Sequence, residues 1–421
     1  MHLKTTLRFC LTFLLLIACD TLLRAQGPGN ALKFDGLDDH VVCGTSNRGI
    51  TNTITVEAWV KTTSAKYHWV VGKYDRYGGE RGYHLIIKDG KAAFAGRDGS
   101  GLYRNSGYTP DLVNDGQWHH LAGISHDGAW QIYVDGILQN EFRSGYKSTD
   151  LTNSAPLALG KDYLADSENF IGMMDEVRIW KSALTKEEIR ARMCSKLVNP
   201  AENVNLVAYY NLDNSGSSTV RDLSRLKLDG TFRNMSPTTA WVTSSAPVGD
   251  KSMSNYQTPD QNTSVAMHMQ ENGFSFHATD LNRTTQGYHI YYVEAKPNTT
   301  TGIADPAQVN SYFGIFQVGK PSANHAIQYF SQNALCRQSL YHRADNPTKQ
   351  WNLLKTVPST EPLRYENMAS QAEFAYNTTG IATPRIQSSG HFCKGGKATL
   401  QINTTGEALW STGEKTKTIT V

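Results

Sequence analysis

GMMDEVRIWKSALTKEEI at residues 172–189 is the stretch that decides the fold of this 421-residue chain, and two other segments precede it. FDGLDDHVV occupies residues 34–42, and a segment from Trp118-His119-His120 to Tyr133-Val134-Asp135-Gly136 lies between the two. Each motif alone is common, because Asp-Gly turns and tryptophan-bearing strands occur in many β proteins. Their order along the chain makes the combination specific.

The chain around these motifs has the pattern of antiparallel strands. The apolar residues of one segment alternate with other residues and therefore share one face of a strand: Ile54, Val56, Ala58 and Val60. Asp135-Gly136 and Asp89-Gly90 each lie between two apolar runs. Both pairs predict two-residue hairpin turns, because the two central residues of a type I′ turn need positive φ.

One short helix is predicted from about Lys186 to Met193. Thr185 can cap its start, and Glu188 stands three residues later, which completes a capping box. Leu184 before the cap can pack against Ile189 and fix the direction in which the chain enters the helix.

Residues 28–242 resemble the laminin-G-like, concanavalin A-type jelly-roll module of secreted proteins, and the three motifs carry this resemblance. It implies an all-β fold, a two-sheet sandwich with the short helix at its edge. Such modules mostly bind glycans or proteins, so the resemblance implies a glycan or an extracellular protein as partner. A likeness of fold does not name the ligand.

The length of the chain predicts two to four domains, because one hydrophobic core rarely serves so many residues. Residues 248–375 form a second β-rich region, which resembles an uncharacterised β module that follows laminin-G-like domains in secreted proteins of the Bacteroidetes type. Residues 384–421 resemble the first strands of an immunoglobulin-like or PKD-like repeat. We therefore expect an incomplete third domain, and a fragment of a longer protein is one of the interpretations that the sequence leaves open.

Residues 1–25 have the pattern of a secretion signal. Lys4 and Arg8 precede an apolar core from Phe9 to Ala18, which is too short for a lasting membrane helix. Cleavage after Ala25 is favoured, while a lipobox-like sequence leaves lipidation of Cys19 as the alternative. No other apolar stretch approaches the length of a transmembrane helix, so we expect a secreted or surface-displayed protein, on the outer surface of a bacterium.

The mature chain keeps four cysteines, Cys43, Cys194, Cys336 and Cys393. Their even number permits two disulfides outside the cytoplasm, and buried free thiols remain an equal alternative. The net charge of +3 is nearly balanced, and no basic stripe interleaved with aromatic residues is present, so we expect no nucleic-acid partner.

The sequence indicates a non-catalytic protein, since it lacks a nucleophile elbow, an HExxH motif and a phosphate loop. Retaining glycosidases need two acids in one cleft. Asp175 and Glu176 are adjacent in a predicted strand, so we expect their side chains on opposite faces of the sheet. The same argument places His119 and His120 apart and predicts no shared metal between them.

A structural calcium is the cofactor that we expect. Asp35, Asp38 and Asp39 crowd one turn, and the resemblance brings the strand with Asp175 close to the N-terminal strand, which gives hard oxygen ligands from two segments. Asp38, Asp39 and Asp175 are the predicted ligands. The alternative is that Asp35-Gly36 forms a tight turn and the neighbouring carboxylates are solvated or cap backbone N–H groups.

Contact with a ligand is predicted for two glycine-rich loops, which carry Tyr77, Tyr103, Arg104 and Tyr108. Aromatic rings beside adaptable polar groups suit the faces of sugars or protein surfaces. Exposed loop tyrosines without a ligand are the alternative. The sequence therefore favours a secreted binding or adhesion protein, with two rival interpretations: the targeting portion of a larger hydrolase, or an architectural spacer.

Overall fold

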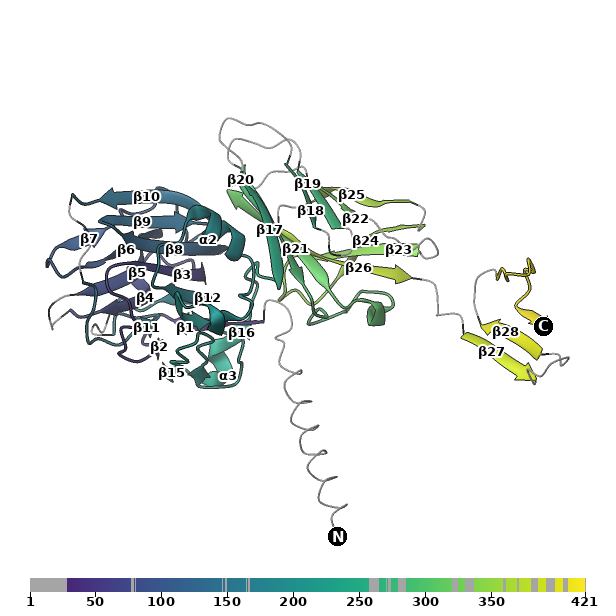
Figure 1. The fold of residues 1–421 in the computed structure, drawn as a ribbon, viewed down its shortest axis with the longest axis horizontal. Helices are drawn as coiled ribbons and strands as arrows, with labels where there is room; N and C mark the ends of the chain where they lie inside the picture. Colours follow the sequence, from purple (N-terminus) through teal and green to yellow (C-terminus); the bar gives the residue numbers. More distant parts are fainter. Residues whose placement is uncertain are drawn as a thin grey trace, which may run out of the picture.

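The computed structural model is built almost entirely of β-strands (Figure 1). It describes residues 29–76, 79, 81–145, 147, 150–163, 165, 167–256, 265–269, 271, 274–278, 285–319, 325–329, 337–358, 361–368, 371–379, 385–390, 398–403 and 408–420. The proposed signal segment, with Cys19, lies outside the described residues, as do Tyr77, Cys336 and Cys393.

The first domain is a sandwich of two antiparallel sheets, which we call sheets A and B. Sheet A has the order β10-β9-β8-β3-β12-β1-β16, with β13 also paired to β12. Its strands are β1 (Asn30–Asp35), β3 (Ile54–Lys61), β8 (Trp118–His126), β9 (Ala129–Val134), β10 (Ile137–Arg143), β12 (Ile171–Trp180), β13 (Leu206–Tyr210) and β16 (Trp241–Thr243).

Sheet B covers one face of sheet A and has the order β14-β15-β2-β11-β4-β5-β6-β7. Its strands are β2 (His40–Val42), β4 (His68–Tyr74), β5 (Gly82–Lys88), β6 (Lys91–Arg97), β7 (Tyr103–Asn105), β11 (Ala158–Leu159), β14 (Thr219–Val220) and β15 (Gly230–Arg233). Alternate residues of both sheets, such as Val56, Leu85 and Phe94, fill the core between them. The predicted all-β jelly-roll sandwich is confirmed.

The turns and the helix follow the local signals in the sequence. Asp135 and Gly136 have φ of 51° and 73°, and Asp89 and Gly90 have φ of 52° and 75°, as the predicted hairpin turns require. Helix α2 runs over Lys186–Arg192, and both hydrogen bonds of its capping box with Thr185 and Glu188 are present. Two shorter helical segments complete the domain, η1 (Pro200–Glu202) and α3 (Pro237–Ala240).

A second sandwich follows, made of sheets C and D (Figure 1). Sheet C has the order β17-β20-β21-β26-β23-β24 and contains β17 (Lys251–Tyr256), β20 (Thr285–Val293), β21 (Tyr312–Gly319), β23 (Arg337–Arg343), β24 (Asn352–Val357) and β26 (Ala372–Thr379). Sheet D has the order β18-β19-β22-β25 and contains β18 (Val265–Met269), β19 (Phe274–Ala278), β22 (His325–Tyr329) and β25 (Leu363–Met368). A turn of 3-10 helix, η3 (Pro306–Gln308), precedes β21.

The two sandwiches meet through a buried apolar interface. The ring of Trp59 on sheet A lies edge-on to Phe316 on sheet C, with centroids 5.2 Å apart. The guanidinium of Arg190 lies 3.8 Å from the ring centroid of Tyr256, whose hydroxyl donates a 2.8 Å hydrogen bond to the carbonyl of Asp135. Trp59 and Phe316 are buried at this contact, so the two domains pack against each other and are not joined by the linker alone.

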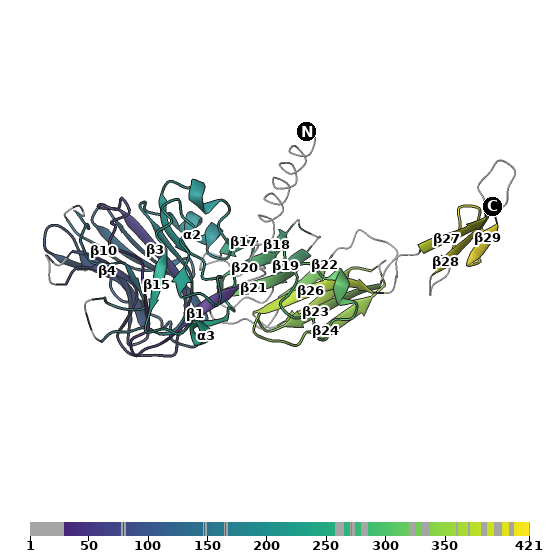
Figure 2. The ribbon, with the colours of Figure 1, turned by 90° about the horizontal axis from the view of Figure 1, so that it is seen from below.

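A fifth sheet contains β27 (Arg385–Gly390), β28 (Ala398–Asn403) and β29 (Thr418–Thr420), and in both views it lies apart from the two sandwiches (Figures 1 and 2). Cys43 and Cys194 are buried free thiols, which fits the alternative without a disulfide for these two residues. Within the described residues, no helix has the length and apolar character needed to span a bilayer.

Candidate ligand-binding face

The outer face of sheet B, turned away from sheet A, carries a cluster of aromatic side chains. Along β5, Tyr83, Leu85 and Ile87 point into the core, so His84 and Ile86 point outward. The residues of this aromatic face come from β4, β5, β7 and the flanking loops: Tyr67, Trp69, Tyr74, His84, Tyr103 and Tyr108. Tyr103 is 47% exposed and is the member most open to solvent among those with a stated exposure.

His84 stands at the centre of the aromatic face. Its ring centroid lies 4.2 Å from that of Trp69, 5.2 Å from that of Tyr74 and 6.0 Å from that of Tyr103. Its Nε2 is 3.2 Å from the hydroxyl of Tyr103, which fixes the orientation of that exposed ring. The aromatic face is therefore organised before any ligand arrives, which lowers the entropy cost of binding.

Two features of β4 place Trp69 on this face. The pairing of β4 with β5 shifts register between Trp69 and Val71, so a bulge turns the indole outward. The ring then lies across Gly72, where a Cβ atom would stand only 2.4 Å from the nearest ring carbon. Glycine at position 72 is thus required by the close approach of the indole.

The aromatic face is electrically neutral. Burial, followed by the nearby charge of Arg76, lowers the pKa of His84 to about 3. Burial also raises the pKa of Tyr103 to about 12 and raises the pKa of Tyr67 and Tyr108. At neutral pH, all four side chains are uncharged. Tyr103 is exposed and Tyr67 and Tyr108 are half-buried, while His84 is only 2% exposed.

A charged rim borders the aromatic face. Nε of Arg76 donates to Asp162 over 3.0 Å, and its Nη2 lies 3.2 Å from a carboxylate oxygen of Glu168. Burial raises the pKa of Glu168, and Arg76 opposes that shift. The rim offers both donors and acceptors beside an apolar floor, the mixture that small-molecule sites commonly use.

The four predicted ligand-binding residues have different fates. Tyr103 and Tyr108 both lie on the aromatic face, and Tyr77 lies outside the described residues. The expectation that Arg104 contacts a ligand from a loop is corrected. Arg104 belongs to β7 and is only 6% exposed, and its Nε lies 3.6 Å from Asp98. Strand alternation turns Arg104 to the side opposite its neighbour Tyr103.

The sequence argument missed Trp69, Tyr74 and His84. The alternation of β5 signals the outward direction of His84, since Leu85 and Ile87 have the other parity. Trp69 gave no such signal, because the bulge that reorients it has no local marker apart from Gly72.

The predicted metal ligands do not converge as expected. Carboxylate oxygens of Asp35, Asp38 and Asp39 lie within 4.8 Å of one another. Asp35 pairs with Ile171 across β1 and β12, so Asp175 stands four residues further along β12. That separation corresponds to about 13 Å of strand, and Asp175 instead accepts a 2.6 Å hydrogen bond from Ser244. The antiparallel register thus excludes Asp175 from the cluster.

The three clustered carboxylates are partly engaged by the turn itself. The N–H of Leu37 donates to Asp35 over 2.8 Å, and the N–H of Asp35 donates to Asp39 over 3.1 Å. Asn234 donates to Asp38 over 2.9 Å. Burial raises the pKa of Asp39, and its acidic neighbours add to the shift. The donor set has the oxygen chemistry that Ca²⁺ prefers, while these hydrogen bonds are those of the alternative interpretation.

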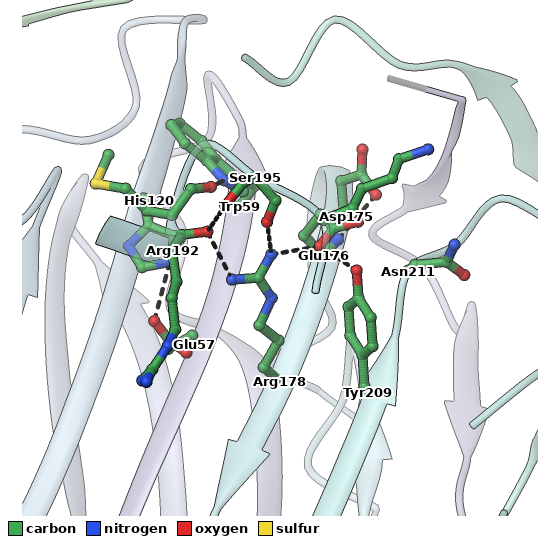
Figure 3. A network of polar contacts seen from close by, with 12 residues as sticks. Glu57, Trp59, His120, Asp175, Glu176, Arg178, Arg192, Ser195, Tyr209 and Asn211 are labelled. Carbon is green, nitrogen blue, oxygen red and sulfur yellow. Dashed lines mark hydrogen bonds and ion pairs between the residues drawn. The ribbon is translucent and has the colours of Figure 1, made fainter. Parts of the chain in front are cut away.

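Asp175 and Glu176 lie on the same face of sheet A, which corrects the expectation that they face apart (Figure 3). Met174 and Val177 both point into the sandwich core, and the register of β12 against β3 shifts between Asp175 and Arg178. Glu176 has a φ of 51° and is the extra residue of this bulge. Plain alternation fails there because the bulge inserts one residue.

These acids form a buried polar cluster rather than an open cleft. Glu176 accepts hydrogen bonds from Arg178 over 2.6 Å and from the hydroxyl of Tyr209 over 2.7 Å. Glu57 accepts one from the indole of Trp180 over 2.6 Å and lies 3.5 Å from Nε2 of His120. Burial raises the pKa of Glu57 and, together with the charge of Glu176, that of Asp175.

The chain that follows α2 covers this cluster (Figure 3). Arg178 donates to the backbone carbonyls of Arg192 and Ser195, over 2.9 and 2.7 Å. The side chains of Glu57, Glu176 and Arg178 are at most 2% exposed. A substrate cannot reach these carboxylates without displacing the segment, so the cluster holds the end of α2 against sheet A.

His119 makes contacts separate from those of His120. Its two ring nitrogens lie 2.8 Å from Asp135 and 3.2 Å from Asp115. Burial disfavours the charged ring, but the two carboxylates outweigh burial and raise the pKa of His119 to about 10. His119 is therefore a charged structural link at neutral pH, while burial keeps the pKa of His120 well below its usual value.

The first domain is similar to domains of known proteins. Residues 35–190 match the family described as the concanavalin A-like lectin/glucanases superfamily. Sushi, von Willebrand factor type A, EGF and pentraxin domain-containing protein 1 of Rattus norvegicus is 28% identical over 87 residues, which are 19% of this chain and 2% of that protein. Human Pentraxin-4 is 34% identical over 89 residues, 18% of each chain. The chain thus spans a small part of these relatives.

The solved structures that match this chain share little sequence with it. A Bacteroides ovatus protein has a TM-score of 0.42 and 21% identity, and the match covers 53% of this chain and 62% of that one. Domain 4 of an extracellular arabinanase from Geobacillus stearothermophilus, solved with arabinotriose, has a TM-score of 0.31 and 23% identity, over 38% and 74%. The family match over residues 35–190 and the two-sheet fold together identify the first domain as a concanavalin A-like sandwich.

Proposed function

We propose that this protein binds glycans and that the aromatic face of sheet B is the binding surface. The observation that carries the proposal is the preorganised ring cluster around His84, with Tyr103 47% exposed at its edge. The family that residues 35–190 match is named for lectins and glucanases, which supports a carbohydrate as the ligand class.

The chemistry of the face fits a sugar better than a charged partner. The C–H face of a sugar ring is apolar and can pack on an aromatic side chain, while its hydroxyls need donors and acceptors at the edge. The ionisable members of the face are neutral at pH 7, and Arg76 at the rim is already paired with Asp162 and Glu168. One guanidinium beside two carboxylates leaves one negative charge at the rim, which disfavours an anionic ligand.

Binding without catalysis is part of the same proposal. Glycoside hydrolysis needs two carboxyl groups that flank an accessible bond. Asp175 and Glu176 share a face, yet Asp175 is 1% exposed and Glu176 is 2% exposed beneath the segment after α2. Their hydrogen bonds to Ser244, Arg178 and Tyr209 give them a structural role.

The location and the cofactor complete the proposal. The segment of residues 1–25 supports export to the cell surface or the medium. A structural calcium would be held by Asp35, Asp38 and Asp39, the acids that lie together, without Asp175.

A glycan array with residues 26–421 tests the binding proposal, followed by titration with the best glycan. Tyr103→Ala should weaken binding about tenfold, a loss of about 1.4 kcal/mol, which is typical for truncation of an aromatic contact. Phe142→Ala is the matched control, since Phe142 is 42% exposed in the same domain but lies on β10 of sheet A. Equal affinity of both variants and the parent would contradict the proposal.

A further inference from the structure

The second sandwich has a cavity at one open end of its core. Tyr292, Phe313 and Phe374 are paired neighbours on β20, β21 and β26, and all three point toward sheet D. Because side chains alternate along a strand, the residues two positions further toward the same end also point inward. Those residues are Glu294 and Ser311, together with Tyr376.

These residues, apart from Phe374, line a cavity of about 490 Å³, which is within the range of small-molecule sites. Tyr292 and Phe313 line its floor, and their ring centroids are 4.8 Å apart. Tyr329 of sheet D stacks on Tyr376 with centroids 3.8 Å apart and closes one wall. Aromatic rings thus come from both sheets, which gives the cavity flat apolar surfaces.

Polar groups gather at the mouth of this cavity. Glu294, Gln308 and Asn310 line it and are exposed, and Ser311 is half-buried beside them. They supply a carboxylate, two amides and a hydroxyl, so the mouth carries both donors and acceptors. The short helix η3 places Gln308 and Asn310 just before β21.

The charge at the mouth argues against an anionic ligand. Lys251 lies 2.8 Å from Glu294 and 2.9 Å from Glu271, so one ammonium group serves two carboxylates. The local sum is one negative charge, which repels carboxylates, sulfates and phosphates. The ammonium group also neutralises much of the field that a cationic ligand would need.

We propose that this cavity, lined by Tyr292, Phe313, Tyr329 and Tyr376, is a second carbohydrate site that takes one neutral sugar unit. The aromatic floor packs on the C–H face of the sugar ring, and the amides and Glu294 hydrogen-bond its hydroxyls. This site belongs to the second sandwich and does not depend on the aromatic face of sheet B. Its ligand class is set by the shape and charge of the cavity itself.

Saturation-transfer NMR with the full chain of residues 26–421 tests the proposal. The probes are methyl glycosides of glucose, galactose, mannose, arabinose and xylose, with methyl glucuronide and sialic acid as charged comparisons. Ser311→Trp places an indole in the mouth without removing a core side chain. Leu353→Trp is the matched control, because Leu353 is 56% exposed on β24 of the same sandwich.

At least one neutral glycoside should bind the parent, the Tyr103→Ala variant and the Leu353→Trp variant, and should lose its signal in Ser311→Trp. Asn310→Ala should weaken the same signal several-fold, which guards against a folding effect of the larger substitution. A signal that vanishes in Tyr103→Ala and survives in Ser311→Trp would overturn the second site and leave the first intact. Binding of the charged sugars alone, or of none, would also overturn it.

Discussion

Gly72→Ala is the change that tests the architecture of the aromatic face most directly. The new Cβ atom would stand 2.4 and 2.7 Å from two carbons of the Trp69 ring, distances that real Cβ contacts do not reach. The backbone of Gly72 is not among the positive-φ residues, so the substitution adds a methyl group without backbone strain. The indole must move, and its 4.2 Å contact with His84 must change with it.

The expected cost has two parts. Overpacking a buried site by one methyl group costs about 1 to 3 kcal/mol. Weakening the contact between Trp69 and His84 adds about 0.5 to 1.5 kcal/mol, if it behaves as other aromatic pairs. A domain of this size loses about 2 to 4 °C of melting temperature for each kcal/mol, so the variant should melt several degrees lower.

Thermal denaturation followed by tryptophan fluorescence measures both effects, since the moved indole is also a reporter. Gly145→Ala is the control, because a Cβ at Gly145 meets nothing within 4 Å and its φ is not positive. That variant should melt within about 1 °C of the parent. Gly72→Ala should cost less stability in a Trp69→Leu background than in the parent, because the clash with the indole is gone.

The result that would refute this reasoning is a Gly72→Ala protein with the melting temperature and glycan affinity of the parent. It would mean that the indole does not lie across Gly72. A loss of stability with unchanged glycan affinity would instead separate Trp69 from the binding surface.

Three further outcomes are expected. Thr185→Ala should lower the stability of the first domain by about 0.5 to 2 kcal/mol, because the N–H of Glu188 loses its cap; chemical denaturation that finds no change would refute the cap. Calcium should raise the melting temperature of the parent, because binding adds about 2.7 kcal/mol to the free energy of unfolding at a hundredfold excess over Kd. Asp38→Asn/Asp39→Asn should abolish that rise while Asp175→Asn keeps it, and an unchanged midpoint in chelator argues against the site. Finally, the raised pKa of His119, about 10 against a usual 6.5, contributes stability that is complete below about pH 6.5 and is lost as the pH rises through about 10. Denaturation across this window should show the parent losing more stability than His119→Gln, and parallel curves would show that the charged ring contributes nothing.

The sequence predicted the features that depend on neighbouring residues. The hairpins at Asp89-Gly90 and Asp135-Gly136 need only two residues with positive φ, and the cap of α2 needs only Thr185 and Glu188. The alternation of Ile54, Val56, Ala58 and Val60 likewise gave the core face of β3. Each of these signals lies within a few residues, so one sequence is enough to read it.

The features that the sequence did not predict depend on bulges and on register. A bulge at Glu176 puts two adjacent acids on one face. Glu176 has a positive φ, but it is not a glycine, so its residue type did not predict this backbone conformation. Another turns Trp69 outward. The register of β1 against β12 decided that Asp175 lies away from Asp38 and Asp39, and register is a long-range property that spacing alone does not give.

The cavity of the second sandwich was missed for the same reason. Its lining comes from β20, β21, β22 and β26 and from residues that flank β20 and β21. These residues are separated by up to 84 positions, from Tyr292 to Tyr376. Each residue alone reads as an ordinary part of a strand or a turn. Only the pairing of β20 with β21 and of β21 with β26 aligns them in two rows.

Two contacts hold the first two domains against each other: Trp59 with Phe316, and Arg190 with Tyr256. The buried contact between them limits changes in the separation and the relative angle of their outer surfaces. A polymer that touches both domains loses its orientational freedom once, and the second contact then forms at a high effective concentration. Selection among polymers would follow from the spacing of their repeating units as well as from the identity of each sugar.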